Sequence, residues 1–135
     1  MMQRGSGGGA GRGGAGRGGG GRGRRRIARF IEPALLLLLR EEPRHGYTLA
    51  EELGRFGFDP ATLDPSIVYR ALREMEEQGW ATSEWDTAGL GPPRRIYRIT
   101  DDGEDYLAWW VADLRRTREQ IDRFLENYAR QREGA

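Results

Sequence analysis

Apolar residues in the first part of the chain recur at helical spacing, and in one run every position is apolar. This run, Leu35–Leu39, lies in a segment that we expect to be helical from Glu32 to Glu41. Pro33 suits the first turn, where a missing backbone N–H costs nothing. The leucines point to all sides of such a helix, which predicts burial on every side. In so small a domain a second chain most easily covers the outer side, and we expect Leu36 to contact it.

Two further helices follow, each with clear end signals. The segment 47–56 carries inward-facing apolar residues at helical spacing and ends at a glycine. The segment 64–78 has the clearest start, because Asp64 is a good N-cap and Pro65 a good first residue, and Gly79 ends it. One face of this helix is apolar and the opposite face is polar. The apolar residues are Val68, Ala71, Leu72 and Met75, and the polar ones are Ser66, Arg70, Arg73 and Glu77.

The next pattern is that of a β-hairpin. Two β-prone runs, 80–86 and 94–100, flank a loop rich in glycine and proline at 87–93. Tyr97 and Ile99 alternate toward one side of the second run. Three arginines give the hairpin a cationic edge: Arg94, Arg95 and Arg98.

The last pattern is a long helix. Thr100 is its expected cap, and an acidic first turn suits the positive end of the helix dipole. Apolar residues then recur in an a/d heptad, which predicts pairing with a second helix. Adjacent tryptophans cannot share one face, so we place Trp110 in this dimer seam and Trp109 against the body. The expected dimer contacts are Leu36, Leu107, Trp110, Leu114, Ile121, Phe124, Leu125 and Tyr128.

Composition separates the first 26 residues from the rest. They hold 13 of the 21 glycines, 7 of the 22 basic residues and no acid, which leaves 15 basic and 21 acidic residues in 27–135. A stretch without apolar groups cannot offset its ordering entropy, so we expect 1–26 to be disordered. Three interpretations stay open: a compositionally biased extension, a start codon placed too early, and an arginine-glycine arm that follows a nucleic-acid backbone.

Residue usage excludes several classes of protein. The 109 residues after the tail suit one small domain, which excludes a two-domain enzyme. No cysteine is present, and the single histidine, His45, argues against a metal cage or a His-dependent acid–base pair. The apolar run is far shorter than the roughly 20 residues that span a bilayer. We therefore predict a cytoplasmic protein without membrane partner, metal, cofactor or enzymatic activity, and interpret His45 as a loop or helix-start residue rather than a sensor.

Three short helices followed by a charged hairpin are the order of a winged helix-turn-helix domain. We accordingly predict a mainly α fold with a small β-hairpin. Residues 27–100 would form the DNA-binding domain, and 101–135 a C-terminal dimerisation helix. In such domains the third helix enters the major groove and the hairpin touches the backbone or the minor groove. Here the third helix and the hairpin are also the elements that carry exposed arginines.

Five pieces of the sequence also carry a resemblance to a known family. They are His45–Tyr47, Leu63–Leu72, Glu76–Gly79, Ser83–Trp85 and Arg94–Gly103. In this order and at these separations they resemble the PadR-like transcriptional regulators, over roughly residues 27–128. The segment Ile31–Pro33, which leads into the leucine run, and the segment Trp85–Thr87 also resemble the branch named for poly-β-hydroxybutyrate-responsive repressors. Ser66 and Ile67 depart from the family, which more often shows Gly and Thr there, and Trp80 replaces an aliphatic residue.

The resemblance implies a homodimeric DNA-binding repressor. We expect it to recognise an inverted repeat in double-stranded DNA through the helix 64–78 and the wing 80–100. The candidate DNA contacts are Tyr47, Ser66, Ile67, Tyr69, Arg70, Arg73, Arg94, Arg95 and Arg98. Two alternatives remain: a winged-helix module that binds protein instead of DNA, and RNA binding driven by the tail. Clustering of the five arginines on one surface would favour the DNA-binding hypothesis.

The resemblance also implies flat aromatic or apolar ligands for several relatives. We expect such an effector to bind where two chains meet, beside Trp109 and Trp110, because the core of one body leaves little room for a ligand. Plain interface packing by both tryptophans is the alternative.

Overall fold

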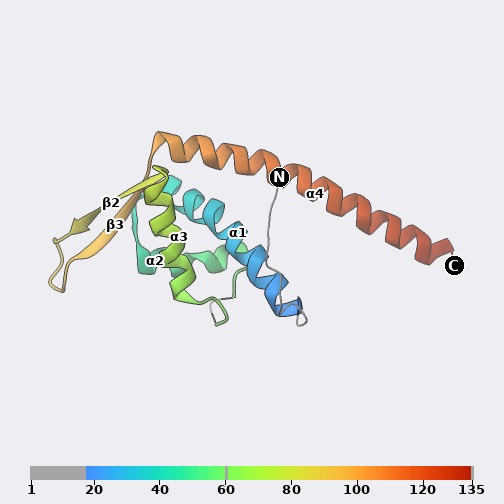
Figure 1. The fold of residues 1–135 in the computed structure, drawn as a ribbon, viewed down its shortest axis with the longest axis horizontal. Coiled ribbons are helices and arrows are strands. Elements are labelled where there is room, and N and C mark those ends of the chain that lie inside the picture. The colour runs from blue at the N-terminus through green and yellow to red at the C-terminus, as the bar shows by residue number, and fades with distance from the viewer. Residues whose placement is uncertain (1–17, 60, 135) are drawn as a thin grey trace.

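The computed structural model describes residues 18–59 and 61–134 as a helical body with a small sheet and one long C-terminal helix (Figure 1). Residues 1–17 of the predicted tail lie outside this described part. The predicted fold class and the order of a winged helix are confirmed. The elements are α1 (Gly18–Glu41), β1 (Arg44–His45), α2 (Gly46–Glu52), the 3₁₀ helix η4 (Leu53–Phe56), α3 (Pro65–Glu77), β2 (Ala81–Asp86), β3 (Arg94–Ile99) and α4 (Asp101–Gly134).

Helix α1 is longer than predicted. We expected it to begin at Glu32, but it extends back to Gly18. Pro33 therefore lies inside the helix rather than in its first turn, where its ring removes one backbone hydrogen bond.

The core lies between α1, α2, α3 and the start of α4. Leu35, Leu36 and Leu38 are fully buried, whereas Leu37 keeps 39% of its surface exposed. The prediction that Leu36 contacts a second chain is therefore wrong, because its side chain is already enclosed by its own chain. Leu37, turned by roughly 100° on the helix, is the leucine that faces outward. The predicted apolar face of α3 is confirmed, with Val68, Ala71, Leu72 and Met75 all buried.

The strands form a three-stranded antiparallel sheet in the order β1-β3-β2. The predicted hairpin is present, and its register runs from Ala81 opposite Ile99 to Asp86 opposite Arg94. The short strand β1 was not predicted, because two residues show no periodicity. It places His45 opposite Ile96 and so ties the start of α2 to the hairpin. Figure 1 shows the hairpin projecting away from the helices as a wing.

The start of α4 is locked onto the body. The Thr100 hydroxyl donates to the Gly79 carbonyl and accepts from the Gly103 N–H. A Cβ on Gly103 would press against the Trp80 carbonyl oxygen, so only glycine allows this close approach. Tyr106 then stacks on Trp80 with ring centroids 3.6 Å apart. The first turns of α4 therefore belong to the core of the body.

The adjacent tryptophans are placed opposite to the prediction. Trp110 is only 9% exposed and packs with the body, whereas Trp109 is 55% exposed. Trp110 lies three residues after the buried Leu107 and shares its inward face, while Trp109 is turned by roughly 100°. Both Leu107 and Trp110 belong to the heptad that we assigned to a dimer seam. The heptad pattern does not specify whether the chain's own body or a second chain covers a given turn.

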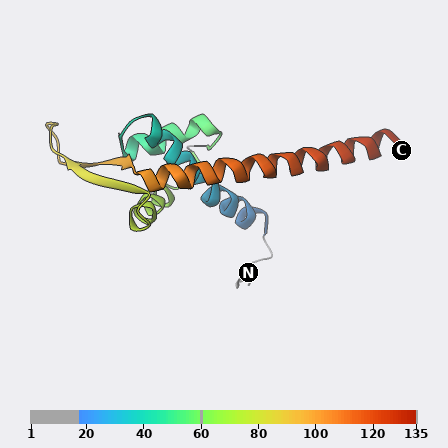
Figure 2. The same cartoon turned by 90° about the horizontal axis from the view of Figure 1, so that it is seen from above.

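Beyond this region α4 leaves the body (Figure 2). Every residue from Arg115 to Gly134 is exposed, including the apolar heptad positions Ile121, Phe124 and Tyr128 and their neighbour Leu125. Leu114 is half-buried at the point of departure. Among the described helices, none has an apolar stretch that is long enough to cross a bilayer.

Candidate nucleic-acid interface

The outer face of α3 presents polar side chains from its first turn onward. The helix begins where the Asp64 carboxylate accepts the Ser66 backbone N–H at 3.0 Å, a bond that holds the pKa of Asp64 below its usual range. Ser66, Tyr69, Arg70 and Arg73 are exposed, as predicted for candidate contacts. Ile67 is different: it is half-buried and packs against the core, beside Val68. The outward orientation expected of Ile67 as a DNA contact is therefore wrong.

A relay of hydrogen bonds joins α3 to the wing and orients Arg95. The Arg95 Nε donates to the Ser83 hydroxyl at 2.9 Å, and that hydroxyl donates to the Glu76 carboxylate at 2.6 Å. The Arg95 guanidinium also lies 4.8 Å from the centre of the Trp85 ring, in cation–π geometry. Arg95 is thereby held between the wing and α3. Sequence patterns did not single out Glu76 and Ser83 for this role.

This relay borders a shallow depression between α3 and β3, which brings together three of the predicted contacts, Tyr69, Arg73 and Arg95. Glu76 and Tyr97 complete its lining. Burial raises the pKa of the Tyr97 hydroxyl, and the nearby Glu76 charge adds to the rise, so the phenol stays neutral. The depression thus presents two guanidinium groups with one carboxylate that already accepts a hydrogen bond.

A second cluster lies where strands β2 and β3 meet the loop 87–93. The His45 Nε2 and the Asp86 carboxylate are 2.9 Å apart, and the His45 ring stacks on Tyr47 with centroids 5.6 Å apart. The Arg94 guanidinium lies 4.9 Å from the centre of the same Tyr47 ring. Tyr47 and Arg94 were predicted DNA contacts. Asp86 was not singled out, because its partner is 41 residues away in the sequence.

The five arginines do not form one cluster, so the expectation that they share one surface is wrong. Side chains alternate across a strand, so Arg94 and Arg98 lie on the opposite face of β3 from Arg95. Arg98 is within 3.8 Å of Glu84, an exposed pair. The two faces adjoin at the start of α2, where the Tyr69 ring packs closely on Gly46. A Cβ on Gly46 would lie 2.7 Å from the Cε1 atom of Tyr69. Tyr47, the next residue, belongs to the cluster of His45, Asp86 and Arg94.

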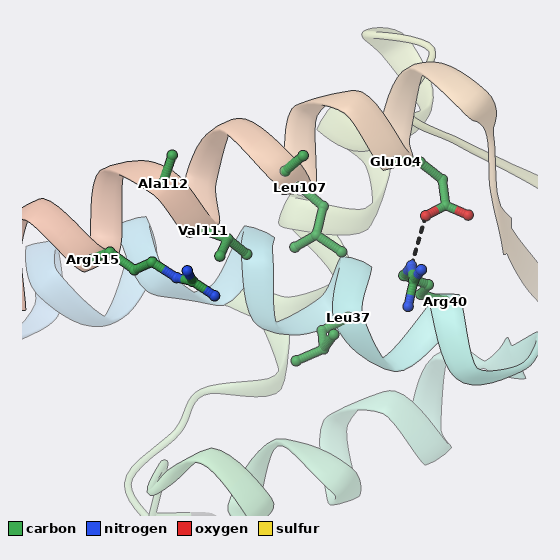
Figure 3. Close-up of a pocket in the computed structure, with 8 residues that line it drawn as sticks. Leu37, Arg40, Glu104, Leu107, Val111, Ala112 and Arg115 are labelled. Carbon is green, nitrogen blue, oxygen red and sulfur yellow. Dashed lines mark hydrogen bonds and ion pairs between the residues drawn. The ribbon is translucent and has the colours of Figure 1, made fainter.

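Two hollows flank α4 away from the wing. Figure 3 shows a groove between α1 and α4 with an apolar floor that includes Leu37, Leu107 and Val111. An ion pair of 2.8 Å between Arg40 and Glu104 lies at one end of the groove, and Arg115 lies toward the other.

The second hollow is a cavity of about 690 Å³ between α4, the middle of α1 and the segment from the end of η4 to Thr62. Its walls include Phe30, Phe58, Trp110, Asp113 and Leu114, but not Trp109. The expectation that one chain leaves little room for a ligand is therefore wrong.

A family comparison agrees with this geometry. The model of the "Transcriptional regulator PadR-like family" matches residues 35–109, which cover the core, α3, the wing and the start of α4. The chain belongs to the PadR-like family of transcriptional regulators. Regulators of this family are not enzymes, and the family places the chain in transcription regulation through DNA binding.

Individual relatives support the same assignment. The negative transcriptional regulator PadR of Bacillus subtilis is 29% identical over 87 residues, 62% of this chain and 46% of its own length. A protein of Mycobacterium tuberculosis, named a probable transcriptional regulator, is 32% identical over 80 residues, 59% of this chain and 42% of its own length. The PadR-like chain thus spans less than half of either relative. A solved conserved protein of unknown function, described as a potential transcriptional factor, is 36% identical with a TM-score of 0.65 and covers 90% of this chain and 96% of its own.

Proposed function

We propose that this PadR-like regulator is a homodimeric cytoplasmic repressor that recognises an inverted repeat in double-stranded DNA. The observation that carries the proposal is the joint placement of Tyr69, Arg73 and Arg95 in one depression between α3 and the wing. A recognition helix in the major groove with a wing on the adjacent backbone needs cationic groups on both elements. The B. subtilis relative is named a negative regulator, which supports the repressor role. The closer likeness to the poly-β-hydroxybutyrate-responsive branch stays a prediction.

The candidate contacts divide by the chemistry that each can provide. Arg70 and Arg73 are exposed on α3 and are proposed to reach base edges, where a bidentate contact to guanine discriminates between bases. Arg94, Arg95 and Arg98 lie on the wing and are proposed to contact phosphates, which add affinity without sequence information. Tyr47, Tyr69 and Ser66 supply hydroxyl donors beside these arginines. Ile67 is not retained, because it packs inward.

Dimerisation is proposed to bury the exposed apolar side of α4. The groove of Figure 3 and the distal heptad positions lie along the same helix, and Leu37 of α1 adds to the groove. A second chain would remove these side chains from water, which is favourable in proportion to the apolar area covered. The proposed contacts are Leu37, Val111, Leu114, Ile121, Phe124, Leu125 and Tyr128. Two recognition helices in such a dimer would need to meet successive major grooves, roughly 34 to 36 Å apart.

A mobility shift with the DNA upstream of the protein's own gene tests the proposal. Arg73→Ala should cost about 1 to 3 kcal/mol and relax specificity at one position in each half-site. Arg95→Ala should weaken binding to all sequences and lower the salt dependence. Arg130→Ala, on exposed distal α4, is the matched control and should bind as the wild type does. Unchanged affinity and footprint in both test variants would favour the protein-interaction module instead.

The arginine-rich segment 1–26 has its own test. As an auxiliary arm it should add phosphate contacts, so its deletion should reduce affinity more at low salt than at high salt and leave specificity intact. Loss of all nucleic-acid binding on deletion, with RNA preferred by the full chain, would favour tail-driven RNA binding. No effect at any salt would favour a biased extension or an early start codon.

An effector is a second element of the proposal, and the cavity beside Trp110 favours it. Its volume of about 690 Å³ falls within the roughly 300 to 1,000 Å³ of typical ligand sites, and aromatic walls suit flat apolar ligands. Planar compounds should quench the fluorescence of Trp110, and Trp110→Leu should abolish this quenching, whereas Trp109→Leu should retain it. Equal quenching in both variants would contradict effector binding in this cavity and favour plain packing by these tryptophans.

A further inference from the structure

The only histidine of the chain lies at the start of α2, as its sequence context indicated. His45 lies at the junction of β1 and α2, with its ring between the end of β2 and the first residues of α2. Its Nε2 is 2.9 Å from the Asp86 carboxylate, and its ring lies nearly parallel to that of Tyr47, at 19°. Arg94 lies over the same tyrosine. Four side chains from four elements thus form one connected group: Asp86, His45, Tyr47 and Arg94.

Each member of this group is accessible to solvent and to a ligand. The His45 side chain is 24% exposed, Asp86 is 32% exposed, and Tyr47 and Arg94 are exposed. A phosphate that reaches Arg94 and the Tyr47 hydroxyl would therefore also lie in the field of His45. Protonated imidazole attracts such an anion and neutral imidazole does not.

We infer that His45 is a proton-sensitive positioning residue of the wing, which links the affinity for DNA phosphates to pH. This inference rests on the proposed DNA-binding function. Protonation would strengthen the contact between His45 and Asp86, hold β1 against the loop end of β2 and add a positive charge beside Tyr47 and Arg94. Bound phosphate would in turn favour the protonated form, because binding and protonation are linked in both directions.

The charged and titratable neighbours are consistent with this assignment. The pKa of Asp86 is held low, first by the Ala88 N–H and then by His45, with Arg94 adding to the effect. Asp86 therefore stays ionised. The adjacent Arg44 directs its guanidinium elsewhere, to the Leu38 carbonyl and the Glu41 carboxylate.

Fluorescence anisotropy with the full chain tests the inference, using a labelled 30-base-pair duplex of arbitrary sequence at low salt between pH 5.5 and 8.5. We expect the wild type to bind roughly three to ten times more tightly at pH 6 than at pH 8. His45→Gln keeps a hydrogen-bond donor to Asp86 but does not titrate, so its affinity should be low and independent of pH. His45→Arg keeps a charge at every pH, so its affinity should be high and independent of pH. Melting temperatures at pH 8 establish that both variants fold.

Proton NMR of the wild type provides a readout that a purely structural role would not change. Since the chain has one histidine, one imidazole resonance reports its titration. We expect the midpoint to move upward when the duplex is added. The inference is overturned if His45→Gln retains the wild-type pH dependence, or if the midpoint is unchanged by DNA, and in both cases DNA binding itself still stands. A wild type that binds no duplex at any pH would overturn the DNA-binding proposal along with it.

Discussion

The body and the distal half of α4 place apolar side chains in opposite environments. In the body, Leu35, Leu49 and Leu72 are fully buried within the single chain. In the distal helix, Phe124 keeps 71% of its surface exposed. The side-chain hydrogen bonds of α4 in this part join residues of the same helix, such as the bond from the Thr117 hydroxyl to the Asp113 carbonyl. An isolated helix gains little stability without packing of its apolar face. The body therefore buries its apolar side chains within one chain, whereas the distal helix leaves its apolar side chains exposed to the proposed second chain.

The largest expected effect is the loss of dimerisation when the distal half of α4 is changed. Ile121→Asp combined with Phe124→Asp places two charges in the proposed apolar seam, which should raise the dimer dissociation constant at least about a hundredfold. Sedimentation velocity measures this change. Gln120→Asp with Asn127→Asp adds the same charge beside the seam and serves as the control. An unchanged dimer in the seam variant would contradict pairing through α4.

A pair of leucine truncations sharpens the contrast in stability. Leu72→Ala removes a fully buried side chain and should cost about 2 to 5 kcal/mol of unfolding free energy through lost burial and a cavity. Leu125→Ala, in the monomeric seam variant, removes a side chain that is 56% exposed and should cost less than about 0.5 kcal/mol. Urea unfolding followed by circular dichroism compares the two. Equal costs would show that the distal helix packs within its own chain.

The start of α3 provides a smaller effect that is confined to the body. Asp64→Ala removes the acceptor for the Ser66 N–H and should lower the melting temperature by about 3 to 8 °C at pH 7. Because the folded pKa of Asp64 is lowered, this contribution is present above the unfolded pKa and is lost as pH falls through the folded value. The melting difference between wild type and variant should therefore disappear at low pH. Asp64→Asn retains an acceptor and should lose less stability.

The smallest expected effect is a gain of stability. Burial raises the pKa of Glu32, although the Tyr106 hydroxyl donates to it at 3.0 Å and opposes the rise. An acid with a raised folded pKa costs stability above that pKa, and the cost declines as pH falls through it. Glu32→Gln keeps an acceptor for Tyr106 and should raise the melting temperature by about 1 to 3 °C at pH 7. The gain should shrink toward pH 4, and a loss at pH 7 would contradict a net cost of the ionised side chain.

The predictions that succeeded depended on signals close together in the sequence. Asp64, Pro65 and Gly79 bound α3 because capping and termination depend on the few residues at each end of a helix. The hairpin followed from two β-prone runs and one Gly/Pro loop, although its register was not predicted. The predictions that failed concerned partners. Leu36, Leu107 and Trp110 were correctly recognised as apolar positions, but their own body covers them rather than a second chain.

The sequence by itself determined the order of the elements, the buried face of α3 and the arginines of α3 and the wing, because each depends on local periodicity and residue chemistry. Only the tertiary structure decided which of these residues meet. Glu76, Ser83 and Arg95 come together because α3 packs beside the wing, and His45 meets Asp86 because β1 pairs with β3. Such contacts join residues up to 41 positions apart, and no periodicity records them. They arise from the packing of whole elements, which positions side chains that have no relation along the chain.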